Sequence, residues 1–189
     1  MKHNLEEIAI LTSGVYLKPG INPDCLYLQA VHFDEFGKPD LRLKPQVKVE
    51  GKSEKHLLCH GDVLFVAKGV HNFAVCYHEN QGRAVASSSF IVVRIKPSFA
   101  EIIDSAYLAW YLSVAPEIHK DHQKQLGTTI PSVSIKKMSK LEVKIPSKKK
   151  QHLIVKIHEL RNQEKALMQT LEKLREMKIQ QMLLESMTD

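Results

Sequence analysis

Hydrophobic residues follow two different patterns along this chain. Up to residue 146, short apolar runs alternate with turns rich in glycine, proline, asparagine and aspartate. The runs are dominated by β-branched and aromatic residues, which favour strands. From Ser147 to about Ser186 there is no glycine or proline, and apolar residues recur every three or four positions. The pattern therefore predicts an α+β domain over residues 1–146 and one long α-helix over residues 147–189.

The strand-rich region also contains signals for short helices. A helix is predicted over Ile102–Val114, where Tyr107 and Tyr111 lie one turn apart, and Pro116 ends it. Ser134 is a residue type that caps helix N-termini, so a short helical turn should follow it. We expect these helices to pack on a mixed, curved β-sheet. The predicted strands are Ala9–Thr12, Leu26–Phe33, Val63–Ala67, Ala74–Tyr77, Phe90–Ile95 and Leu141–Ile145.

The long helix carries a heptad repeat. Leucine occupies four successive d positions, and two of the a positions hold the charged residues Glu164 and Lys178. About 39 helical residues would extend roughly 58 Å, which is longer than a domain of this size is wide. An apolar stripe on such a helix needs a partner, so we expect an antiparallel coiled coil between two copies, with Glu164 facing Lys178 or Arg161. This leucine stripe comprises Leu153, Ile157, Leu160, Glu164, Leu167, Leu171, Leu174 and Lys178.

The positive charge is concentrated in the last part of the chain. The formal net charge is +6, and residues 136–189 hold 13 lysines and arginines against 7 acidic residues. Residues 1–135 hold 14 of each and are neutral overall. Clustered positive charge favours polyanions such as nucleic acid, although a basic helix is also common as a solvated surface.

The amino-acid composition indicates a globular protein and argues against a membrane or secreted protein. With 43% hydrophobic and 25% charged residues, the chain is typical of a globular protein. No apolar run approaches the roughly 20 residues of a membrane helix, and the N-terminus lacks the apolar core of a signal peptide. We therefore expect a cytoplasmic protein. The cysteines, Cys25, Cys59 and Cys76, form no CxxC pair, so we expect reduced and mostly buried thiols, no metal site and no cofactor.

One pattern leaves a catalytic alternative open. Pro39-Asp40 followed by Glu50-Gly51-Lys52 matches the loose PD-(D/E)xK pattern of nucleases, in which two carboxylates hold Mg²⁺ and a lysine helps to activate water. The pattern is degenerate and lies in a polar, turn-rich stretch, so we interpret the chain as non-catalytic. A coiled-coil adaptor without DNA specificity is the second alternative, because it would explain the long helix by itself.

Five segments, taken in order, resemble a single family. They are Gly61–Gly69, Ala84–Arg94, Tyr107–Leu112, Gly127–Ser134 and Leu141–Pro146, and the long helix follows them. In this order they resemble the specificity (S) subunits of type I restriction–modification systems, over almost the full chain. The resemblance implies a DNA target-recognition domain and a spacer helix, which direct methyltransferase and restriction subunits to a split site in double-stranded DNA.

This chain departs from the family in two respects. It has one recognition domain and one helix where the family has two of each, so it resembles a half-subunit. A homodimer would restore the two-domain layout and should read a palindromic split site. The chain also has Ser147-Lys148-Lys149-Lys150-Gln151 where the family more often has Pro-Pro-x-x-Glu-Gln. This difference would alter the surface that faces the methyltransferase.

Polar residues on loops are the candidate DNA contacts. Arginine and lysine suit guanine, asparagine and glutamine suit adenine, and serine and threonine suit either. Lysines that follow the Gly-Thr-Thr-Ile-Pro-Ser loop would supply charge to the DNA backbone. A serine triplet is as often a turn with satisfied hydroxyls, and a structural role stays open for it. The candidates are Lys68, His71, Asn72, Gln81, Arg83, Ser87, Ser88, Ser89, Thr128, Thr129, Ser132, Lys136, Lys137 and Lys140.

Overall fold

The computed structural model confirms the predicted α+β class and divides into two compact units. The first unit comprises residues 1–152, and the second is the rest of the long helix from Leu153. The structure describes all residues except 35, 41, 70–71, 117–131 and 188–189. The elements, with 3-10 helices labelled η, are β1 (Lys2–Asn4), α1 (Leu5–Ile8), β2 (Ala9–Ser13), β3 (Leu26–Leu28), η1 (Ala30–His32), η2 (Gly51–His56), β4 (Val63–Val66), β5 (Ala74–Cys76), η3 (Glu79–Gln81), β6 (Ala84–Ala86), β7 (Phe90–Ile95), η4 (Pro97–Phe99), α2 (Ser105–Val114), α4 (Ile135–Ser139), β8 (Glu142–Lys144) and α5 (Lys148–Ser186).

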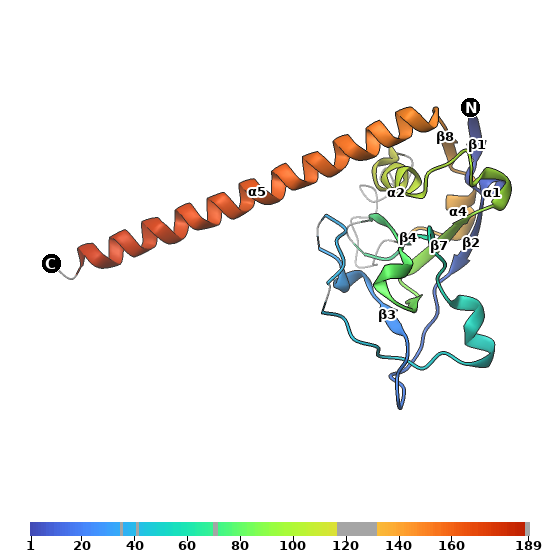
Figure 1. Ribbon diagram of the computed structural model, residues 1–189, viewed down its shortest axis with the longest axis horizontal. Helices are drawn as coiled ribbons and strands as arrows, with labels where there is room; N and C mark the ends of the chain where they lie inside the picture. The colour runs from blue at the N-terminus through green and yellow to red at the C-terminus, as the bar shows by residue number, and fades with distance from the viewer. Residues whose placement is uncertain (35, 41, 70–71, 117–131, 188–189) are drawn as a thin grey trace. The chain divides into compact units, whose positions relative to one another are not determined.

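A four-stranded antiparallel sheet forms the centre of the first unit (Figure 1). Its strand order is β2-β7-β4-β5, so β4 and β7 have neighbours on both sides. All four residues of β4 are buried, and their side chains alternate between two hydrophobic cores. Val63 and Phe65 belong to one core, and Leu64 and Val66 belong to the other. A strand that is buried on both faces has to be apolar throughout, which explains the unbroken apolar run.

Short helices pack against the first core. α2 lies against β4 and β5 and contributes Leu108 and Leu112 to this core. Asp104 caps α2, because its carboxylate accepts hydrogen bonds from two backbone N–H groups of the first turn. Ser134 caps α4 as predicted, since its hydroxyl accepts a hydrogen bond from the Lys137 backbone N–H at 3.2 Å. The caps thus begin both helices at residues that the sequence marks.

Two further strand pairs complete the first unit. β3 and β6 run parallel, and residues of both belong to the second core. β1 and β8 run antiparallel and join the beginning of the chain to the segment before α5. The strands β1, which reads Lys-His-Asn, and β6, which reads Ala-Val-Ala, are not predicted from the sequence, because neither carries an apolar alternation or a strong strand propensity.

Two predicted boundaries in the first unit are wrong by more than a residue or two. The strand predicted over Leu26–Phe33 ends at Leu28, because residues 30–32 turn into η1 and the Phe33 N–H bonds to the Ala30 carbonyl. The helix predicted from Ile102 begins at Ser105, where the Asp104 cap sets its first turn. In both places a local hydrogen bond ends the regular structure that the apolar pattern alone would extend.

An ion pair between buried Asp62 and half-exposed Arg94 joins the segment before β4 to β7. The carboxylate of Asp62 is 1% exposed and accepts two hydrogen bonds from the Arg94 guanidinium, both at 2.7 Å. It also accepts a hydrogen bond from the backbone N–H of Cys59 at 2.8 Å. The hydrogen bond to Asp62 raises the pKa of Arg94 above its ordinary value. These contacts fix the turn from which β4 starts.

The first turn of α5 belongs to the packing of the first unit. Gln151 is fully buried, and its side-chain oxygen accepts a hydrogen bond from the Asp104 N–H at 2.8 Å. Its side-chain nitrogen donates to the carbonyls of Ile102 and Pro146, at 2.9 and 2.8 Å. A buried amide with all of these bonds is satisfied, and replacing it would leave three backbone groups without partners.

Beyond this turn α5 is one continuous helix, 39 residues long in all (Figure 1). The apolar residues of the leucine stripe are about half to two-thirds exposed, with Leu171 at 48% and Leu167 at 70%. Glu164 pairs with Arg161 of the same chain at 2.7 Å. None of the helices that the structure describes is both long and apolar enough to span a membrane.

The three cysteines are free and differ in exposure. Cys25 is buried, Cys76 is half-buried and Cys59 is exposed, so the expectation of mostly buried thiols fails at Cys59. Cys25 packs with Tyr27 and Val47 in a third apolar cluster, and burial raises the pKa of its thiol to about 11. Burial also raises the pKa of Cys76.

Substitution of Asp62 by alanine should lower the free energy of unfolding by about 1–3 kcal/mol, because it leaves the Cys59 backbone N–H without its acceptor and removes two hydrogen bonds from the half-exposed Arg94 side chain. Urea denaturation measures the change. Asp40→Ala is the matched control, since the Asp40–Arg42 pair is exposed and its loss should leave stability nearly unchanged. Equal effects of the two substitutions would contradict the structural role of Asp62.

Alkylation of the native protein at pH 8 should modify Cys59 first and Cys25 last, because the thiolate is the reactive form and burial disfavours it at Cys25. Peptide mapping by mass spectrometry gives the rate at each site. In concentrated urea the three rates should become similar. A native Cys25 that reacts as fast as Cys59 would contradict the packing of the third cluster.

Candidate nucleic-acid interface

Three of the predicted contact segments meet at the end of β4. The backbone of Lys68 pairs with that of Ser132, and the Val133 N–H donates to the Ala67 carbonyl at 2.8 Å. The Ala67 N–H in turn donates to the Ser89 carbonyl at 2.8 Å. Lys68 and Ser132 are exposed, and Ser89 is half-buried. The fold thus brings residues that are far apart in sequence into one polar cluster, which comprises Lys68, Ser89 and Ser132.

Asn72 lies at the same end of β4 but faces inward. Its side-chain nitrogen donates a hydrogen bond to the Val66 carbonyl at 2.6 Å, and the residue is buried. Its side-chain oxygen has no hydrogen-bond partner among the described residues. Three other predicted contacts, His71, Thr128 and Thr129, lie outside the part of the chain that the structure describes.

Gln81 and Arg83 lie elsewhere and bind their own chain. The side-chain oxygen of Gln81 accepts a hydrogen bond from the His78 N–H at 3.2 Å, within the turn that carries η3. Arg83 forms an ion pair with Asp24, and its guanidinium also donates to the Val49 carbonyl at 3.1 Å. Both side chains therefore hold loop segments in place.

Three predicted lysines lie on α4 or directly after it. Lys136 and Lys140 are exposed, and Lys137 is half-buried. α4 lies beside α1 and β2, and its Met138 belongs to the first core. The three lysines therefore lie on or next to one short helix, and none of them lines the hollow beside the serine triplet.

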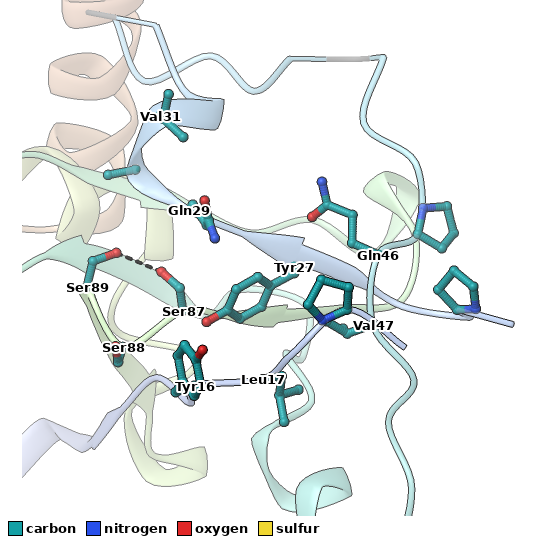
Figure 2. Close-up of a pocket in the computed structure, with 14 residues that line it drawn as sticks. Tyr16, Leu17, Tyr27, Gln29, Val31, Gln46, Val47, Ser87, Ser88 and Ser89 are labelled. Carbon is teal, nitrogen blue, oxygen red and sulfur yellow. Dashed lines mark hydrogen bonds between the residues drawn. The ribbon is translucent and has the colours of Figure 1, made fainter. Parts of the chain in front are cut away.

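A hollow of about 870 Å³ opens beside the serine triplet (Figure 2). Four segments form its walls: the stretch after β2, the end of β3 with η1, the loop before Val47, and the turn between β6 and β7. Buried Tyr27 and Val47 belong to the third apolar cluster beneath it. The lining residues are Tyr16, Leu17, Pro19, Pro23, Tyr27, Gln29, Ala30, Val31, Pro45, Gln46, Val47, Ser87, Ser88 and Ser89.

Some polar groups of this hollow already have partners within the chain. The Tyr27 hydroxyl donates to the Val15 carbonyl at 3.0 Å, and the hydroxyls of Ser87 and Ser89 bind each other at 2.7 Å (Figure 2). Such bonds fix the walls of the hollow. Two hydroxyls of the serine triplet are therefore satisfied within the turn, which agrees with the structural role that the sequence left open for it.

Other polar groups of the hollow remain available. The Gln46 amide and the Ser88 hydroxyl make no side-chain hydrogen bond within the described part of the chain, and neither does the hydroxyl of Tyr16, a residue that is 72% exposed. All three groups are uncharged, and each can both donate and accept a hydrogen bond. Tyr16 and Gln46 are not among the contacts predicted from the sequence, because each is a single polar residue beside apolar neighbours and belongs to no motif.

Positive charges exceed negative charges among the residues next to the lining of the hollow. Lys18 and Lys44 each precede a proline of the lining, are exposed, and form no ion pair within the residues that the structure describes. Asp24 adjoins the lining as well, but it is paired with Arg83. Lys48 is paired with Glu50. Residues 1–135, which are neutral overall, therefore include two lysines next to lining residues that form no ion pair within the described part of the chain.

The residues of the nuclease alternative have other partners. Asp40 pairs with Arg42, and this hydrogen bond holds the pKa of the Asp40 carboxyl below its ordinary value. Glu50 pairs with Lys48. Within the described residues, no group of three or more histidine, cysteine, aspartate or glutamate side chains is placed to hold a metal ion.

Solved structures with a similar fold come from type I restriction–modification systems. A chain from a study of complex assembly and conformational transition of the type I system superposes with a TM-score of 0.59 and is 14% identical, covering 89% of this chain. The S subunit from M. genitalium superposes with a TM-score of 0.52 and is 15% identical, covering 83% of this chain. The HsdS subunit from Thermoanaerobacter tengcongensis superposes with a TM-score of 0.55 and is 13% identical, covering 88% of this chain.

These likenesses extend over only part of the related proteins. This chain spans 39%, 37% and 38% of the three solved chains, respectively. A comparison with curated protein sequences finds no match. Residues 22–176 match the family model described as the type I restriction modification DNA specificity domain, which includes most of the first unit and most of α5. The chain therefore belongs to the type I restriction–modification DNA specificity domain family.

Proposed function

We propose that this chain recognises one half of a split DNA sequence for a type I restriction–modification system and has no catalytic role of its own. The convergence of polar groups at the end of β4 and around the hollow carries the proposal, because sequence recognition needs such groups on a rigid support. Lys68, Ser88 and Ser132 are the predicted contacts that this surface presents. Lys136 and Lys140 would add contacts to phosphates.

The helix supports a second part of the proposal, in which two copies pair through the leucine stripe. Its leucines are largely exposed, and water disfavours a continuous apolar stripe of this length. One copy spans less than two-fifths of the related solved chains, so two copies would supply most of their length. In an antiparallel pair, Glu164 could exchange its bond to Arg161 for one across the interface.

The partners follow from the family. A methyltransferase subunit would dock on the dimer and modify the DNA that it selects, and a restriction subunit would join the same assembly. Lys148, Lys149 and Lys150 begin α5, and Lys148 donates to the Ala100 carbonyl at 3.3 Å. The other two lysines are exposed and would make this part of the methyltransferase-facing surface basic.

Replacement of Leu160, Leu167 and Leu171 by lysine should convert a dimer into a monomer, because three charges would enter the apolar stripe. Light scattering coupled to size-exclusion chromatography gives the mass. In selection from random duplex DNA, the wild type should enrich two half-sites at a fixed separation, and the variant only one half-site.

The matched control for this experiment is Asn162→Lys with Gln169→Lys, which adds lysines to the same helix outside the stripe and should leave the dimer intact. A triple leucine variant that stays dimeric would place the interface elsewhere. Replacement of Lys68, Ser88 and Ser132 by alanine tests recognition separately, since it should weaken the selection of a specific sequence while the dimer persists.

A further inference from the structure

We propose that Gln46 reads an adenine of the half-site from within the hollow, an inference that rests on the proposed function. The amide of Gln46 lines the hollow, and no side-chain hydrogen bond is assigned to it among the described residues. An amide offers a donor and an acceptor side by side, which matches the N6 amino group and N7 of adenine in the major groove. Guanine would present two acceptors to the same amide, so it fits less well.

The backbone around Gln46 is fixed, although its side chain is not. The Gln46 N–H donates to the Cys25 carbonyl at 3.0 Å, and Cys25 and Val47 exchange a further pair of backbone bonds at 3.1 and 3.2 Å. Cys25 and Val47 are both buried. Pro45 restricts the backbone from the other side. The amide therefore extends from a rigid strand-like support, as a specificity contact requires.

The other amide and guanidinium side chains that the sequence predicts as DNA contacts form bonds within their own chain. Asn72 is buried against Val66, Gln81 caps its own turn, and Arg83 holds Asp24. A side chain that already satisfies its own loop would have to break that bond before it could read a base. Gln46 has no such bond to break, which favours it as the base-reading residue.

The surroundings of Gln46 fit the edge of an A·T pair. Val31 lines the same hollow with a side chain that is 79% exposed, and an apolar group of this kind suits the methyl group of thymine. Figure 2 shows Val31, Gln29 and Gln46 around the same side of the hollow. Lys18 and Lys44 would contact the phosphates that flank the base pair.

Selection of random duplex DNA by the full-length wild-type chain and by Gln46→Ala tests this assignment. At one position of each half-site, the variant should lose its preference for adenine by about 5- to 150-fold, while every other position stays as in the wild type. Gln46→Glu should shift the same position toward cytosine, because a carboxylate accepts from the cytosine amino group. Such a redirected preference cannot arise from misfolding.

Asn80→Ala is the matched control, since it removes an exposed amide that does not line the hollow, and its profile should equal that of the wild type. If both Gln46 variants select the wild-type sequence, the assignment of Gln46 is wrong and the proposed function stands. If the wild-type chain selects no sequence, the proposed function fails and the assignment fails with it.

The phosphate contacts have a separate signature. Lys18→Ala and Lys44→Ala should each weaken binding to all sequences alike and reduce the slope of log affinity against log salt by about 1. Titrations of the selected duplex at several salt concentrations measure this slope. Lys52→Ala, at an exposed lysine of η2 outside the lining, should change it less. Unchanged slopes for both variants would remove these lysines from the interface.

Discussion

The burial of β4 on both faces is the constraint on which the rest of the recognition domain depends. Because one core receives Val63 and Phe65 and the other receives Leu64 and Val66, this strand cannot shift without disturbing both. The Asp62–Arg94 pair fixes where it starts. Its far end then places Lys68, Ser89 and Ser132 through backbone hydrogen bonds. The apolar packing of β4 thus positions these polar residues, although their own side chains are not part of either hydrophobic core.

Charge around the hollow shows why a domain average is a poor guide to binding. The first 135 residues are neutral in total, yet Asp24 and Glu50 are paired, whereas Lys18 and Lys44 form no ion pair with any residue that the structure describes. The Asp24–Arg83 and Glu50–Lys48 pairs each have no net charge, so the local excess of charge comes from the two unpaired lysines. A polyanion that approaches this opening therefore meets a more positive surface than the composition suggests.

The long helix poses a different physical problem. Its leucine stripe is regular enough to specify a heptad, but the exposed leucines leave the free energy of burial unrealised in a single chain. Gln151, by contrast, is satisfied within the first unit by three hydrogen bonds. The helix therefore begins with contacts that are complete within the first unit and continues with a leucine stripe that the single chain leaves exposed.

The sequence by itself determined the elements with strong periodicity: the apolar run of β4, the Ser134 cap and the heptads of α5. These depend on local spacing, which a sequence contains. It could not determine β1 and β6, whose pairing depends on distant strands, nor where Leu26–Phe33 would break. Of the residues at the end of β4 and around the hollow, it named Lys68 and the serines but not Gln46, and it could not show that Arg83 is paired with Asp24. Only the tertiary structure decided which polar side chains already have partners, because those partners lie up to 59 residues away along the chain.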